Sequence, residues 1–170
     1  MTTQKNRIKT GAELESSIKR IALQIYENAI EESEIVLIGV APRGQELAEK
    51  IEQALHLFSD LKLLKGDITL NKKKPLDGAQ CSLSLEQVAN KSIVIVDDVL
   101  NTGSTLIYAV HHFLQVPVKQ IKTAVMVNRN HKKYPIKADF KGLSLSTSVN
   151  EHISVIFSTV SEPPILGTEM

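Results

Sequence analysis

An apolar run that ends in two adjacent aspartates constrains the fold of this chain more than any other feature. The run covers residues 92–96, Asp97 and Asp98 follow it, and a helical pattern begins after a short polar loop. Apolar residues without alternation are typical of a parallel strand buried on both faces. We therefore expect both carboxylates to emerge at the carboxyl end of a strand, where open α/β sheets bind their ligands.

The loop after the aspartates is suited to a phosphate group. Backbone N–H groups and hydroxyls at the start of a helix favour a phosphate dianion. The aspartates beside such a loop could hold ribose hydroxyls and a hydrated Mg²⁺, either directly or through water. The pattern therefore predicts a ribose 5-phosphate site with Asp97 and Asp98 as the metal-binding residues. Its loop consists of Asn101, Thr102, Gly103, Ser104 and Thr105.

Two other protein classes also place aspartates at the end of a buried strand, namely receiver domains and nucleotide hydrolases. A hydrolase would need a Gly-x-x-x-x-Gly-Lys-Ser/Thr loop, and the chain contains none. It also lacks the Gly-x-Gly-x-x-Gly pattern of the usual dinucleotide folds. The complete string, rather than the acid pair alone, favours a phosphoribosyl site.

A second anion site is predicted after the apolar strand at residues 35–40. Pro42, Arg43 and Gly44 follow that strand, at the same sheet edge as the aspartates. Glycine lets backbone N–H groups approach an anion, and the planar fork of Arg43 suits a diphosphate. The alternative is an ordinary turn with a solvated arginine. Beside the phosphoribosyl pattern we favour pyrophosphate binding.

Strands alternate with helices along the chain, which predicts an α/β fold with a mostly parallel sheet. The chain has 170 residues, 42% of them hydrophobic, and we expect one domain over residues 1–170. Asn71–Leu83 is predicted to be a mobile loop and Ser161–Met170 a loose tail. Helices are expected at about 13–30, 45–55 and 105–115, and strands at 35–40, 61–64, 67–70, 92–96, 121–127, 138–140 and 153–157.

Composition excludes some classes of protein. No apolar run approaches the roughly 18 residues of a membrane span. The first residues lack the apolar core of a signal segment, so we expect a cytoplasmic protein with no membrane partner. The single cysteine, Cys81, cannot form an internal disulfide, and the net charge of +1 gives no overall attraction to nucleic acid.

The string at residues 92–105 closely resembles the phosphoribosyl-pyrophosphate signature of type I phosphoribosyltransferases. Residues 35–44, with the helix that follows, resemble that family's pyrophosphate loop. The similarity runs from about Leu14 to Phe157. It implies a single-domain type I phosphoribosyltransferase fold, in which helices flank a central, mostly parallel sheet with a small hood. Three further segments, 66–70, 128–131 and 135–140, are similar to the branch of bifunctional pyrimidine-operon attenuators with uracil phosphoribosyltransferase activity.

The resemblance implies an activity in nucleotide salvage. Ribose 5-phosphate would pass from phosphoribosyl pyrophosphate to a nucleobase, uracil in the first instance, with Mg²⁺ as cofactor. Asp97, Asp98 and Arg43 would be catalytic, and the donor would bind residues 42–44, both aspartates and residues 101–105. We also expect a homodimer or a higher homo-oligomer.

The resemblance also places a base pocket. Arg129 and His131 match the family's Asp-Arg-Gly-His segment, and Leu145 lies in a stretch, 142–148, that resembles the hood. A purine acceptor is an alternative. It would be indicated by an acidic hood residue, for which Asp139 and Glu151 are the nearby candidates.

The segment after Leu70 departs from the family pattern. The family's Tyr-Arg-Asp-Asp is replaced by an asparagine and three lysines, Lys72, Lys73 and Lys74. In the family this loop closes over the active site and brings a basic group to the pyrophosphate, so we expect one lysine to supply that charge.

A second alternative is an RNA-binding attenuation regulator with weak or no catalysis. Lys19 and Arg20 match the attenuators' RNA surface only in part. The remaining basic residues are scattered rather than aligned, which favours ordinary solvated lysines over an RNA site.

Overall fold

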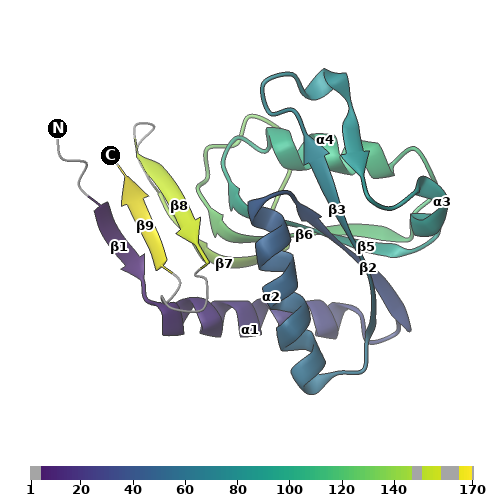
Figure 1. Ribbon diagram of the computed structural model, residues 1–170, viewed down its shortest axis with the longest axis horizontal. Coiled ribbons are helices and arrows are strands. Elements are labelled where there is room, and N and C mark those ends of the chain that lie inside the picture. Colours follow the sequence, from purple (N-terminus) through teal and green to yellow (C-terminus); the bar gives the residue numbers. More distant parts are fainter. Residues whose placement is uncertain (1–4, 147–150, 158–164, 170) are drawn as a thin grey trace.

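The computed structural model describes residues 5–146, 151–157 and 165–169 (Figure 1). Its main layer is a six-stranded sheet in the order β4-β3-β2-β5-β6-β7. Neighbouring strands are parallel except β4, which runs antiparallel to β3. The sequence prediction of a mostly parallel α/β sheet is confirmed. The strands are β2 (Glu34–Val40), β3 (Lys62–Leu70), β4 (Ala79–Cys81), β5 (Ser92–Leu100), β6 (Gln120–Asn128) and β7 (Phe140–Ser144).

Helices cover both faces of this sheet. α1 (Gly11–Asn28) and α2 (Arg43–Phe58) pack on one face, and α4 (Ser104–Phe113) packs on the other (Figure 1). Alternate side chains of β5 point to opposite faces of the sheet: Val94 packs with α1 and α2, whereas Ile95 packs with α4. Because both faces are buried, the strand needs apolar residues at consecutive positions. A four-residue helix, α3 (Leu85–Val88), precedes β5.

A second, smaller sheet stands beside the first. It consists of β1 (Lys5–Lys9), β9 (Ile165–Glu169) and β8 (His152–Ile156), all antiparallel in the order β1-β9-β8. Figure 1 shows its strands from opposite ends of the chain side by side. Ile153 and Val155 of β8 are buried against the core under α1. This sheet is the small hood.

Two loop predictions need correction. Ser161–Met170 was expected to be a loose tail, but residues 165–169 form β9, paired with β1 and β8. Asn71–Leu83 was expected to be a loop, but its second half contains β4 and a 3₁₀ turn at Pro75–Asp77, which makes the segment a hairpin with β3. In both cases the segment forms a strand because another part of the chain supplies the hydrogen-bond partners.

Several element boundaries also differ. α2 begins at Arg43 rather than at 45, and the two strands expected at 61–64 and 67–70 are one continuous strand, β3, which begins at Lys62. β5 continues to Leu100, so that the two aspartates lie within the strand instead of beyond its end. No helix among the described residues is long and apolar enough to cross a membrane.

Candidate functional site

A cavity of about 490 Å³ opens at the carboxyl ends of the central strands. It brings together three segments that the sequence analysis singled out: Arg43, the aspartate pair, and the loop at residues 101–105. The hairpin tip contributes Lys72, and the small sheet contributes two residues of β8. The complete lining is Arg43, Lys72, Asp97, Asp98, Val99, Leu100, Asn101, Thr102, Gly103, Ser104, Thr105, Leu106, His152 and Ile153.

The conformation of the loop between β5 and α4 depends on Gly103 and on hydrogen bonds from residues 133 and 134. Gly103 precedes the helix with φ of +88°, a conformation in which a side chain would be strained, and a Cβ there would overlap Ile136. The carbonyl of Thr102 accepts hydrogen bonds from the backbone N–H groups of Lys133 and Tyr134, at 2.8 and 3.3 Å. The first N–H groups of α4 have no acceptor within the helix and lie at the cavity. The N–H of Ser104 donates to Oγ1 of Thr102 at 3.2 Å, and the loop has the form expected of an anion cradle.

The two aspartates are buried inside β5, 4% and 8% exposed for Asp97 and Asp98. Oδ1 of Asp97 accepts the N–H of Asp98, and Oδ1 of Asp98 accepts the N–H of Val99, both at 2.9 Å. Burial, with the neighbouring Asp98 charge, raises the pKa of Asp97 to about 8, and the charge of Lys72 opposes this rise. The raised pKa means that Asp97 holds its proton to higher pH than an ordinary aspartate, and a cation beside it would oppose this.

The turn into α2, predicted to bind pyrophosphate, forms another side of the cavity. Arg43 is the first residue of that helix, and its Nη1 lies 3.8 Å from Oδ2 of Asp98. Gly44 is buried, and a Cβ at this position would meet the Cα of Asp97 at 3.0 Å, so glycine lets the helix start rest against β5. The peptide between Ala41 and Pro42 is cis. Pro42 and Gly44 shape this turn without lining the cavity.

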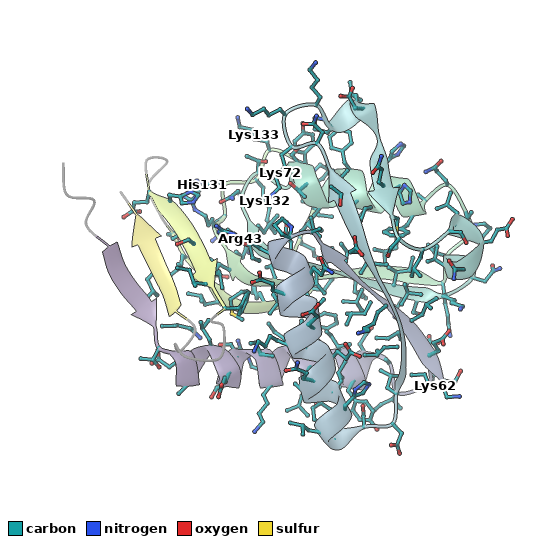
Figure 2. The ribbon with its side chains drawn as sticks, in the orientation of Figure 1. Arg43, Lys62, Lys72, His131, Lys132 and Lys133 are labelled. Atoms are coloured by element: carbon teal, nitrogen blue, oxygen red, sulfur yellow. The ribbon has the colours of Figure 1, made fainter. Side chains whose placement is uncertain are left out.

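The lysines of the hairpin tip differ in their positions. Lys72 lines the cavity, whereas Lys73 and Lys74 do not. Figure 2 shows Lys72 and Arg43 on the same side of the molecule, with Lys62 at the far end. The tip is organised by the side chain of Asn71, whose Oδ1 accepts the N–H groups of Lys73 and Lys74 at 3.0 and 3.1 Å.

The predicted base-pocket residues lie behind the cavity wall rather than in it. Arg129 is 7% exposed, while His131 and Leu145 are half-buried, and none of the three lines the cavity. Leu145 donates its N–H to the carbonyl of Asn128 at 2.9 Å.

The hood-like stretch 142–148 is also placed differently, because residues 142–144 belong to β7 of the main sheet. Residues 147 and 148 lie outside the described part of the chain. The small sheet instead offers His152 and Ile153, which the sequence analysis missed. The only signal for them was the apolar pattern of a short strand, which does not reveal that β8 folds back to the cavity.

The residues present fit a Mg²⁺ ion that is shared with a ligand. Within residues 5–146, 151–157 and 165–169, no group of three or more His, Cys, Asp or Glu side chains could enclose a metal. Mg²⁺ is usually held by one or two carboxylates together with substrate phosphates and water. Asp97 and Asp98, between two anion-binding segments, match that arrangement.

Comparisons with known proteins agree with this geometry. Residues 4–159 match the model of the phosphoribosyl transferase domain. The Bifunctional protein PyrR of Clostridium novyi is 35% identical over 158 residues, which cover 86% of this chain and 89% of that protein. The Bifunctional protein PyrR of Haemophilus ducreyi is 30% identical over 154 residues, covering 84% of each chain.

Solved structures show the same fold. The hypoxanthine phosphoribosyltransferase of Trypanosoma cruzi, in complex with the product IMP, superposes with a TM-score of 0.76 at 18% identity, covering 96% of this chain and 93% of that one. A hypoxanthine-guanine phosphoribosyltransferase from Bacillus anthracis gives a TM-score of 0.75 at 16% identity and 98% coverage of both chains.

Proposed function

The chain belongs to the phosphoribosyltransferase family, in the branch of the pyrimidine-operon attenuators, and we propose that it transfers ribose 5-phosphate from phosphoribosyl pyrophosphate to uracil. One observation carries the proposal. The buried pair Asp97 and Asp98 lies in a single cavity between a phosphate cradle, residues 101–105, and two cationic side chains, Arg43 and Lys72. That order of charges matches a ribose with a phosphate at one end and a pyrophosphate at the other.

The chemistry requires positioning and charge more than a nucleophile. The reaction passes through a cationic, oxocarbenium-like ribose as pyrophosphate leaves. Arg43 and Lys72 would stabilise the negative charge that develops on the leaving group, and Asp97 and Asp98 would hold ribose hydroxyls below the developing cation. Mg²⁺, held by these carboxylates and the pyrophosphate, would supply further charge stabilisation. The phosphate loop would orient the ribose for attack by a ring nitrogen of the base.

A pyrimidine acceptor is supported by the positions of the acidic candidates for purine recognition. Asp139 is committed elsewhere: its Oδ2 accepts the N–H of Thr123 at 2.9 Å, and its Oδ1 lies 3.6 Å from Nζ of Lys137. Neither Asp139 nor Glu151 lines the cavity. The relatives' name, Bifunctional protein PyrR, also supports uracil over a purine.

The regulator alternative is favoured by that same name and by the altered hairpin tip. Two contacts count against a free basic surface on α1. The guanidinium of Arg20 donates to the carbonyls of Lys141 and Gly142, and Nζ of Lys9 donates to Oγ of Ser17 at 2.7 Å. RNA binding and a homo-oligomeric state therefore stay proposals, to be measured by filter binding at two salt concentrations and by light scattering.

The deciding experiment offers the protein phosphoribosyl pyrophosphate and Mg²⁺ with uracil, hypoxanthine, guanine, xanthine or adenine in turn. The proposal expects UMP as the main product, with the purines turned over at least tenfold more slowly. A preferred purine would overturn the choice of base. Absence of any product, together with tight RNA binding, would establish the regulator.

A further inference from the structure

The buried residue Arg129 connects the two parts of the molecule that enclose the cavity. It follows β6 directly and is only 7% exposed. Its side chain contacts Asn101 of the phosphate loop, which follows β5, and also residue 151, which precedes β8. Arg129 does not line the cavity, so its buried charge must act through the groups that it contacts.

Hydrogen bonds of the side chain reach both of these segments. Nη1 donates to Oδ1 of Asn101 at 2.9 Å, and Nη2 donates to the carbonyl of Glu151 at 2.6 Å. The backbone N–H of Arg129 also donates to the carbonyl of Leu100 at 3.0 Å. Hydrogen bonds from a guanidinium are short and strong, and its planar fork fixes the direction of both. Arg129 thus holds two segments at a defined distance.

The connection matters because the two segments belong to separate sheets. The phosphate loop follows β5 of the main sheet, whereas His152 and Ile153 belong to the small sheet, and no strand pairing joins these sheets in the described residues. Ile153 and Val155 attach the small sheet through apolar burial. Apolar burial is strong but has no direction, so it does not by itself set the spacing across the cavity.

We propose that Arg129 is a positioning residue that sets the spacing between the phosphate loop and β8. This inference rests on the proposed function, in which the phosphate loop holds the ribose 5-phosphate, and it assigns β8, which lines the same cavity through His152 and Ile153, to the nucleobase end of the ligand. With the fork intact, the base nitrogen and the ribose carbon meet at reacting distance. Without it, each half of the ligand still binds, but the two halves are misaligned.

Two ligands separate this role from a merely structural one. Ribose 5-phosphate would contact the phosphate loop and the aspartates but not β8, whereas UMP would span the cavity from the loop to β8. Loss of the fork should therefore weaken UMP binding more than ribose 5-phosphate binding. In steady-state assays kcat should fall more than the KM for phosphoribosyl pyrophosphate rises, because alignment is realised in the transition state.

The experiment measures both affinities by calorimetry, kcat and KM, and thermal melting for wild type, Arg129→Lys, Arg129→Gln and Asn101→Ala. Lys132→Gln is the matched control, since this exposed cation lies in the same segment and outside the cavity lining. We expect the ratio of UMP to ribose 5-phosphate affinity to fall at least tenfold in both Arg129 variants and severalfold in Asn101→Ala. Lysine keeps the charge but cannot make both bonds, so it should not restore the ratio.

A ratio that is unchanged in folded variants would overturn the positioning role. If the Arg129 variants do not fold, Asn101→Ala decides, because it removes one bond of the fork from an exposed residue and leaves the arginine in place. If wild-type protein binds neither ligand, the proposed function fails and the inference falls with it. Normal wild-type binding with an unchanged ratio removes the inference alone.

Discussion

Two of the regions that supply charges to the cavity are built differently. The β5–α4 segment contributes buried aspartates and a loop whose carbonyl at Thr102 is held by two backbone hydrogen bonds. The β3–β4 hairpin contributes Lys72 from an exposed tip, where the side chain of Asn71 supplies local hydrogen bonds. A buried, cross-linked segment is preorganised, whereas an exposed tip can adjust to a ligand.

The difference suggests a division of labour between the regions. Groups that must be in place before the ligand arrives lie on the buried strand and its loop, where packing holds them. Lys72, which together with Arg43 is proposed to meet the leaving group, lies on the hairpin tip, from which it could approach after binding. The following measurements test that division.

The largest effect is expected on the buried strand. Asp97→Asn with Asp98→Asn keeps the shape of both side chains and removes their charge, so turnover should fall by a factor on the order of a thousand. Melting temperature should not fall, because the burial of Asp97 already disfavours its charged form. UMP formation and circular dichroism melting provide the two readouts. A double variant that turns over within tenfold of wild type would show that the pair is structural.

A smaller effect is expected at the hairpin tip, and only at one of its lysines. Lys72→Ala should lower kcat by about a hundredfold, with a lesser effect on KM, because its charge acts mainly in the transition state. Lys73→Ala and Lys74→Ala are the controls and should change kcat less than about twofold, as expected for surface substitutions. Equal losses for all three would mean that the tip acts as a diffuse charge. No loss for any would remove the hairpin from catalysis.

The phosphate loop should respond more weakly to the loss of a single hydroxyl. Thr105→Val replaces that hydroxyl by a methyl group, so ribose 5-phosphate affinity should fall by about tenfold, or 1.4 kcal/mol. Thr69→Val is the matched control, because it makes the same substitution in the other region, at an exposed position of β3 outside the cavity lining. Calorimetry of both variants gives the comparison. Equal affinity in wild type and Thr105→Val would exclude this hydroxyl from the cradle.

The smallest effect concerns the pH dependence of stability. Since the pKa of Asp97 is raised from 3.8 to about 8, the folded protein retains a proton that the unfolded chain releases within this interval. The contribution of Asp97 to the free energy of unfolding is therefore full below about pH 4 and is lost as pH rises to about 8.

Asp97→Asn removes this dependence. Its melting temperature relative to wild type should rise by several degrees between about pH 5 and pH 8. Lys72→Ala, at the other region, should not produce that rise. Parallel melting curves for wild type and Asp97→Asn across this range would contradict a raised pKa.

Local sequence was sufficient where one continuous segment carries both the fold and the site. The run from residue 92 to 105 predicted a buried strand, an acid pair, a phosphate loop and a helix start. In the structure the acid pair lies inside the buried strand, and a loop at the cavity and a helix start follow it. The same approach failed for the small sheet. β1 is mostly polar, and β9 is a short mixed sequence with a glycine at its centre. The two strands pair with each other from opposite ends of the chain, and neither has a local pattern that would indicate a strand.

The sequence by itself determined the parallel sheet, the aspartate pair and the phosphate loop, because apolar periodicity and loop chemistry are properties of neighbouring residues. Only the tertiary structure decided that Lys72, rather than Lys73 or Lys74, lines the cavity, and that His152 and Ile153 of β8 close its other side. It also decided that Arg129 faces Asn101 and the carbonyl of Glu151 rather than the cavity. These contacts join residues that are far apart in the chain. Their distances depend on how two sheets pack together, which no local pattern of residues specifies.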